Sequence, residues 1–203
     1  MRNTAQVNIT HLYESTESGG KREAILNAAL QLFTERGFHG TAMPLVAELA
    51  GVGAGTIYRY FESKEALVNT LYRDWKEFQL AMILRDVLPQ TSLREQFHLY
   101  WHRLVAFAME HPVAFGFLEL HFHAPYLDDA SRALEERGHH ALVGFFKECL
   151  RQKVSKEAPP EMLGSLVVGA YIGLIKASRA GFIKMTQTII DQAEACCWEA
   201  IKR

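Results

Sequence analysis

The chain has 203 residues, of which 49% are apolar, and its 22 Lys and Arg against 23 Asp and Glu give a formal net charge of −1. This composition predicts a soluble globular protein with a substantial core and excludes a disulfide-stapled miniprotein or a disordered tail. It also excludes a broad basic coat for nucleic acid. A small DNA-reading surface is still compatible with it, because only charges within roughly 10 Å of the phosphates act on them.

Apolar residues recur at helical spacing from Lys21 onward, between short Gly and Pro interruptions, and strand signals are nearly absent. The chain is therefore predicted to be all-α with about nine helices. In chain order, these helices are expected at 21–36, 44–51, 54–61, 64–87, 92–110, 113–123, 128–154, 161–180 and 186–202.

Two of the short predicted helices form a helix-turn-helix. The link Gly51-Val52-Gly53 joins them, and the preceding helix, which carries Ile25, Ala29 and Phe33 on one face, braces them. Ser63 is placed to cap the long helix that follows.

The helix predicted at 161–180 is apolar on all sides and contains three glycines, so it has to be covered on all sides. A second subunit is the natural cover. Its most apolar stretch, Leu163 to Ile175, falls short of the roughly 20 residues of a membrane span, and we expect no membrane partner.

Cysteine usage and the N-terminus both favour a reducing, cytoplasmic compartment. The three cysteines are an odd number, and the adjacent pair Cys196 and Cys197 is poor geometry for a structural disulfide. The first twenty residues are polar and lack the apolar core of a signal peptide.

The run KREAILNAALQLFTERGFHGTAMPLVAELAGVGAGTIYRYFESKEALVNTLY, at 21–72, resembles the DNA-binding domain of the TetR (tetracycline-repressor-like) family of bacterial transcriptional regulators. A second run, HPVAFGFLELHFHAPYLD, is similar to one C-terminal subgroup of that family. The landmarks of the first run, in order, are Ile25, Ala29, Phe33, Gly37, Thr41, Ala47, Ala50-Gly51-Val52, Gly55-Thr56-Ile57-Tyr58-Arg59-Tyr60-Phe61 and Ser63-Lys64-Glu65.

This resemblance implies a flexible N-terminal arm at 1–20, a three-helix helix-turn-helix DNA-binding domain at 21–66, and a helical effector-binding and dimerisation domain at 67–203. It implies an Ω-shaped homodimer that pairs through its last two helices. Such a dimer binds a near-palindromic double-stranded DNA operator as a repressor, and a small-molecule effector releases it.

The resemblance also assigns DNA-binding positions. The first turn and the outward side of the recognition helix are the candidate readers of base edges, and Lys64 and Tyr60 match positions that bind phosphate. Where relatives commonly carry hydroxyl or polar side chains, this chain has 42–45 as Ala-Met-Pro-Leu, although Thr41 is placed to cap the second helix. The full predicted set is Lys21, Arg22, Thr41, Ala54, Gly55, Thr56, Tyr58, Arg59, Tyr60 and Lys64.

The predicted DNA-binding half is not basic. Up to Asp74 it carries seven Lys and Arg against eight Asp and Glu. Few phosphate contacts imply a shallow salt dependence and weak non-specific binding, so specific binding would depend on dimerisation.

Aromatic residues are concentrated in the second half of the chain, and most are expected to be core. A subset with nearby polar groups has the makeup of a small-molecule site. The predicted ligand-binding residues are Trp101, Phe117, Glu119, His121, Phe122 and Tyr171.

Nine histidines raise the alternative of a metal-responsive regulator. His98 and His102 have a two-ligand spacing on one helix face, and Glu119, His121 and His123 are further candidates. Ordinary hydrogen bonding or pocket lining is the favoured interpretation of these residues, so no metal site and no cofactor are predicted. A redox-responsive regulator is the companion alternative.

An all-α enzyme, with Glu119 and His123 as acid and base, is the rival from another class. The chain contains no nucleophile motif or cofactor fingerprint, so no catalytic residue is assigned and the protein is not predicted to be an enzyme. A ligand carrier without DNA binding would leave residues 21–72 unexplained.

Overall fold

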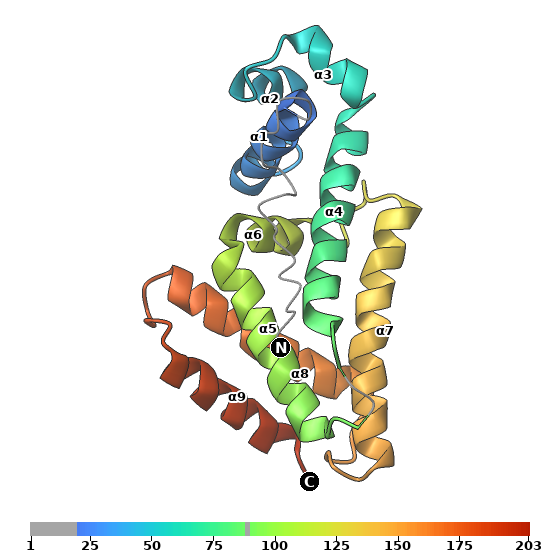
Figure 1. Ribbon diagram of the computed structural model, residues 1–203, viewed down its shortest axis with the longest axis vertical. Coiled ribbons are helices and arrows are strands. Elements are labelled where there is room, and N and C mark those ends of the chain that lie inside the picture. Colours follow the sequence, from blue (N-terminus) through green and yellow to red (C-terminus); the bar gives the residue numbers. More distant parts are fainter. Residues whose placement is uncertain (1–19, 88–89) are drawn as a thin grey trace, which may run out of the picture. The chain divides into compact units, whose positions relative to one another are not determined.

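The computed structural model describes residues 20–87 and 90–203, and the predicted N-terminal arm lies almost entirely outside them. The described residues form nine α-helices without a strand, which confirms the all-α prediction (Figure 1). The helices are α1 (Gly20–Arg36), α2 (Met43–Leu49), α3 (Ala54–Tyr60), α4 (Lys64–Leu84), α5 (Leu93–Glu110), α6 (Pro112–His121), α7 (Asp129–Arg151), α8 (Pro160–Arg179) and α9 (Gln187–Ile201).

Local capping chemistry explains where several helices begin. The hydroxyl of Ser63 accepts a hydrogen bond from the backbone N–H of Ala66, as predicted for the start of α4. Ser92 and Glu95 form a reciprocal capping box at α5, and Thr186 caps α9. α7 ends three residues earlier than predicted, because Lys153 adopts a left-handed conformation with φ of 57°.

The chain divides into two compact units. Of the described residues, the first contains those up to Trp75 together with Val113–Ser131, and the second contains those of 76–112 and Arg132–Arg203. Most of α6 and the loop that follows it therefore belong to the same compact unit as α1–α3, which we call the head. The domain boundary after residue 66 stays a prediction. We call residues 122–128 the α6–α7 loop.

The first unit is built around the aromatic ring of Phe33, which is fully buried. It lies against Phe117 of α6, at 6.4 Å between ring centroids, and against His121 at 6.0 Å. Burial of aromatic surface is the main stabilising contribution here, and it joins α1 to α6.

In the second unit, α5 lies beside both α8 and α9 (Figure 1). Arg94 of α5 donates two hydrogen bonds, at 2.5 and 3.0 Å, to the buried carboxylate of Glu194 in α9. The two parallel bonds satisfy the buried charge, which would otherwise be costly.

α8 has the predicted length of 20 residues but differs from its prediction in burial. Its 20 residues are long and apolar enough to cross a membrane, although a core helix of a soluble protein can have the same composition. Only one face, including Leu163, Val167 and Tyr171, is buried, while Met162 and Leu166 are 46% and 57% exposed. The expected all-round cover is therefore not provided by residues 20–87 and 90–203.

Candidate nucleic-acid interface

The turn between α2 and α3 depends on one glycine. Gly51 has φ of +65°, in the left-handed region that non-glycine residues rarely adopt. The N–H of the following Val52 donates to the carbonyl of Ala47 at 2.9 Å, which closes the end of α2. This closure turns the chain sharply into α3 and gives the helix-turn-helix that the sequence predicted.

α3 has an inner and an outer face of different chemistry. Ile57 is fully buried, whereas Tyr58 and Tyr60 are 54% and 45% exposed and Arg59 is also exposed. Ala54 and Gly55 are exposed in the first turn, and Thr56 is half-buried. The outer face of α3 therefore exposes hydroxyl groups and one guanidinium. At Ala54 and Gly55 it also exposes backbone that carries no large side chain.

The turn from α1 to α2 shapes the edge of this face. A Cβ at Gly40 would lie 2.3 Å from the carbonyl oxygen of Arg36, so the turn excludes any larger residue there. Phe38 is buried in the same turn, at 7% exposed.

Thr41 does not cap α2 as the sequence suggested. The N-cap is Ala42, without a side-chain cap, while the Thr41 hydroxyl lies toward the carbonyls of Leu32 and Gly37 at 3.1 and 2.8 Å. Thr41 is 1% exposed. Its hydroxyl stabilises the end of α1 and is turned away from the outer face.

Lys64 is the first residue of α4, and its ammonium holds the α1–α2 turn. It donates to the carbonyls of Phe38 and Thr41 at 2.8 and 3.0 Å, and it lies 4.2 Å from the centroid of the Phe38 ring. An ammonium group has three N–H donors, so these two bonds leave one donor uncommitted by them.

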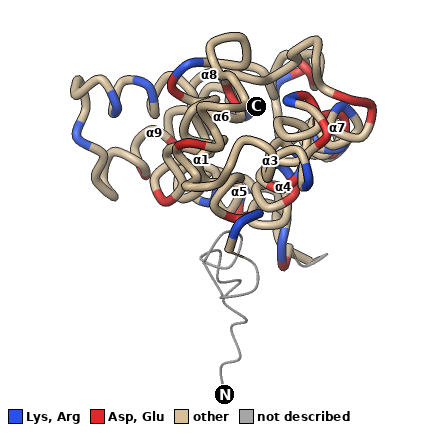
Figure 2. Tube along the Cα trace, turned by 90° about the horizontal axis from the view of Figure 1, so that it is seen from above, with Lys and Arg blue, Asp and Glu red and all other residues tan. Residues whose placement is uncertain are grey.

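Few other basic side chains lie near the start of the DNA-binding half beside Lys64 and Arg59. Lys21 and Arg22 are exposed at the start of α1, and the Arg22 guanidinium lies 5.6 Å from the Phe61 ring centroid. Along the described chain, basic positions are interspersed with acidic ones rather than gathered into a long basic run (Figure 2). This matches the near-neutral charge found in the sequence.

The predicted ligand-binding residues are divided between the two units. Trp101 and Tyr171 belong to the second, where the indole N–H donates to the Ile190 carbonyl at 3.2 Å and the Tyr171 hydroxyl donates to the Leu104 carbonyl at 3.0 Å. Both are buried, at 1% and 3% exposed. Their polar atoms are therefore already hydrogen-bonded inside the unit.

The other four predicted ligand-binding residues belong to the first unit. The rings of Phe117 and His121 are buried side by side, with centroids 4.5 Å apart, Glu119 is half-buried, and Phe122 is 56% exposed. Burial lowers the pKa of His121 to about 4, against a smaller opposing effect of the Phe33 backbone, so its imidazole is neutral near pH 7.

Two open grooves run along α1, and none of the six predicted ligand-binding residues lines either of them. One, of about 360 Å³, is lined by Asn27, Leu30, Gln31, Thr34, Glu35 and Val113. The other is lined by Ala24, Asn27, Ala28, Gln31, Leu49 and Ala50.

The histidines do not support the metal alternative. Within residues 20–87 and 90–203, no group of three or more His, Cys, Asp or Glu is placed to hold a metal ion. The rings of His98 and His102 lie against each other, tilted by 48° with their centroids 4.1 Å apart, and their acidic partners are Glu194 at 3.9 Å and Asp191 at 3.5 Å. These contacts belong to a polar cluster between α5 and α9.

Three residues that join the α6–α7 loop to the head and to α4 were not found from the sequence. Tyr126 of the loop contacts Asn69, 57 positions earlier in the chain, and Phe38, 88 positions earlier. Tyr126 lies in the run HPVAFGFLELHFHAPYLD, whose similarity to a C-terminal subgroup was recognised. That similarity does not show which residues the Tyr126 side chain contacts.

Comparison with known proteins decides the family. The profile of bacterial regulatory proteins of the tetR family matches residues 25–71, and that of the tetracyclin repressor-like C-terminal domain matches residues 75–203. The chain belongs to the tetR family. This confirms the predicted class of helix-turn-helix transcriptional regulator, and the family's members are DNA-binding regulators rather than enzymes.

Individual relatives agree with this assignment. The chain is 40% identical over 82 residues to the HTH-type transcriptional regulator RutR of Escherichia coli K12, covering 39% of each chain. It is 24% identical over 159 residues to the HTH-type regulator YhgD of Bacillus subtilis 168, covering 76% of this chain and 82% of YhgD. The match to RutR thus spans well under half of that relative.

A solved structure extends the likeness to the whole fold. The tetR family transcription regulator from Shewanella sp. PV-4 superposes with a TM-score of 0.74 at 26% identity, covering 90% of this chain and 98% of that one.

Proposed function

We propose that this tetR family member is a cytoplasmic transcriptional repressor that binds an operator as a homodimer and is released by a small-molecule effector. The observation that carries the DNA contact is the division of α3. Ile57 anchors the helix while Tyr58, Arg59 and Tyr60 extend from the unit. Arg59 supplies the one guanidinium on α3, the group that binds guanine or phosphate through two parallel hydrogen bonds.

The remaining contacts follow from what lies at the surface. Gly55 and Ala54 allow close approach of the α3 backbone, and the Thr56, Tyr58 and Tyr60 hydroxyls reach bases or phosphates. Lys21, Arg22 and Lys64 supply phosphate contacts. Thr41 is omitted from the proposed interface because its hydroxyl is buried.

The homodimer is proposed to form through α8 and α9, because α8 leaves apolar and small side chains uncovered. Leu166 and Met162 are exposed beside Gly169 and Gly173, and such a stripe allows two helices to approach closely. Two-fold symmetry then demands two half-sites about 34 to 36 Å apart.

Effector control is proposed to act along α4, which runs without a break from Lys64 in the first unit to Leu84 in the second. Its Lys64 end carries a proposed phosphate contact. An effector that binds better to the DNA-free conformation would shift the population toward it, whereas equal affinity for both would shift nothing. The aromatic residues predicted from the sequence remain the proposed effector contacts.

The test is a titration of the purified protein with a duplex that it has selected from a random DNA pool. Arg59→Ala should weaken binding by about tenfold to a hundredfold, with unchanged mass and helicity. Arg137→Ala removes an exposed guanidinium from α7 and should bind as the wild type does. Equal affinity of the Arg59 variant and the wild type would remove Arg59 from the interface.

A further inference from the structure

The α6–α7 loop packs on the DNA-binding head through the aromatic ring of Tyr126. The ring of Tyr126 stacks on that of Phe38, with centroids 3.9 Å apart and planes inclined by 18°. Phe38 lies in the turn between α1 and α2, immediately before the helix-turn-helix. A loop from the C-terminal half of the chain is therefore in direct contact with the turn that leads into the DNA-reading helices.

Phe38 is also the residue that Lys64 holds. The Lys64 ammonium binds the Phe38 carbonyl at 2.8 Å and lies 4.2 Å from the centroid of its ring. The ammonium thus contacts both the carbonyl and the ring of Phe38, and its other carbonyl partner is that of Thr41 at 3.0 Å. The Phe38 ring is in turn stacked on that of Tyr126. All four residues lie within the first unit.

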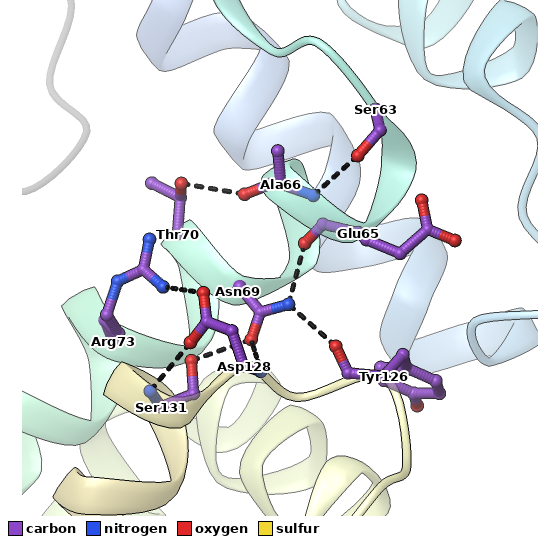
Figure 3. A network of polar contacts seen from close by, with 9 residues as sticks. All are labelled: Ser63, Glu65, Ala66, Asn69, Thr70, Arg73, Tyr126, Asp128 and Ser131. Atoms are coloured by element: carbon purple, nitrogen blue, oxygen red, sulfur yellow. Dashed lines mark hydrogen bonds and ion pairs between the residues drawn. The ribbon is translucent and has the colours of Figure 1, made fainter.

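A buried polar network fixes the loop that carries Tyr126 to α4 (Figure 3). The Asn69 amide, 3% exposed, donates to the carbonyls of Glu65 and Tyr126 at 2.9 and 2.8 Å. Its oxygen accepts from the Asp128 N–H and the Ser131 hydroxyl, each at 2.8 Å. Both groups of the amide are thus used, so the loop is held in one register on α4.

The same loop is tied to the end of α6. The Tyr126 hydroxyl and Nδ1 of the fully buried His121 are 2.5 Å apart. Asp128 caps the start of α7 through the Ser131 N–H at 2.8 Å and pairs with Arg73 of α4 at 2.6 Å. A displacement at the end of α6 would therefore move Tyr126 directly.

We propose that Tyr126 is a positioning residue for DNA binding, which holds Phe38 and, through it, the Lys64 ammonium at the edge of the DNA-reading face. This rests on the proposed function, in which Lys64 contacts phosphate. It makes the α6–α7 loop the element through which α6 regulates the head. Its effect reaches DNA only through Lys64, which gives it a signature that a general stabilising role lacks.

The experiment measures affinity for the selected duplex as a function of salt. Tyr126→Ala should weaken binding by about threefold to tenfold, the value of one aromatic pair, and should bring the salt slope to that of Lys64→Ala. Tyr126→Phe keeps the ring and should bind within about twofold of the wild type. Tyr100→Ala, the same truncation in the second unit, should leave affinity and slope unchanged.

A double-mutant cycle gives the sharpest readout. In a Lys64→Ala background, Tyr126→Ala should have no further effect on affinity, because the group it positions is already gone. Tyr126→Leu, which retains apolar bulk, replaces the alanine variant if circular dichroism shows that the latter is unfolded. Additive effects, or wild-type affinity of Tyr126→Ala (or of Tyr126→Leu where it replaces the alanine variant), would overturn the proposal while leaving the proposed function intact. An unchanged affinity and slope in Lys64→Ala alone would overturn the proposal and, with it, the phosphate contact assigned to Lys64.

Discussion

The outer face of α3 and the outer face of α8 are both exposed, but they expose opposite chemistry. α3 presents the hydroxyls of Tyr58 and Tyr60 and the guanidinium of Arg59, and it buries its apolar residue Ile57. α8 presents Met162 and Leu166 beside glycines, and Phe182 just beyond it is 84% exposed. The first surface suits hydrated phosphates and base edges, whereas the second gains free energy only when water is excluded from it.

One chain of net charge −1 thus has two surfaces suited to two different partners: α3 to DNA and α8 to a second subunit. DNA affinity on a near-neutral head depends on a few positioned groups, since there is no excess of basic residues to supply it. In the proposed homodimer, two heads joined by an apolar interface would double those few contacts.

A charge on the exposed α8 face should weaken dimerisation, and this is the largest effect that we expect. Leu166→Glu places a carboxylate in the proposed interface and should weaken dimerisation by about a hundredfold or more, because the charge would be buried without a partner. Analytical ultracentrifugation measures the dimer. Ala133→Glu adds the same charge at an exposed position of α7 and should leave it intact. A fully dimeric Leu166 variant would place the interface elsewhere.

Removal of the Asn69 amide should destabilise the first unit. Asn69→Ala leaves four hydrogen-bonding groups without their partner and should lower the free energy of unfolding by about 3 kcal/mol. Thr70→Ala removes one hydroxyl that bonds only within α4 and should cost about 0.5 kcal/mol. Urea denaturation compares them, and equal costs would mean that the network does not hold the loop.

His121 should make the stability of the protein depend on pH. Its pKa is lowered from 6.5 to about 4 by burial, so between these values the unfolded chain binds a proton that the folded chain does not. The free energy of unfolding should therefore fall by up to about 3 kcal/mol as the pH drops from 6.5 to 4. His121→Gln should flatten this dependence in denaturation curves at several pH values, and parallel curves for the two proteins would contradict it.

A single methyl group on α3 should have opposite effects on folding and on DNA binding. Gly55 lacks a positive φ, and an added Cβ would meet nothing within 4 Å, so nothing in the described chain requires a glycine there. Gly55→Ala should stabilise the fold by about 0.5 to 1 kcal/mol and weaken operator binding. The matched Gly144→Ala, in an equally open position of α7, should stabilise without affecting DNA. Unchanged DNA affinity in the Gly55 variant would show that DNA does not approach this backbone.

Helices and caps were predictable because they depend on neighbouring residues. Apolar spacing gave all nine helices of the described chain, and Ser63 caps α4 as its sequence position indicates. The start of α2 was less accessible. Thr41 precedes the helix as a cap residue should, but its hydroxyl is drawn back to the end of α1 by two carbonyls that local sequence does not reveal.

The part of the candidate site that could not be predicted from the sequence consists of contacts between residues far apart in the chain. The contact of Tyr126 with Phe38 and the bonds of Asn69 to the loop join segments far apart in the chain. They also need α6 to end at His121 and the backbone at His123 to turn with φ of 56°. Periodicity records which side of a helix is buried, but it carries no information on which distant side chain fills the space.

The most direct test of the central claim, that two α3 helices on one dimer read DNA, is a hydroxyl-radical footprint on the selected duplex. We predict two protected half-sites with centres about 34 to 36 Å apart, one dimer per duplex, and loss of both protections in Arg59→Ala but not in Arg137→Ala. A single protected segment bound by one monomer, or protection unchanged by Arg59→Ala, would contradict the account.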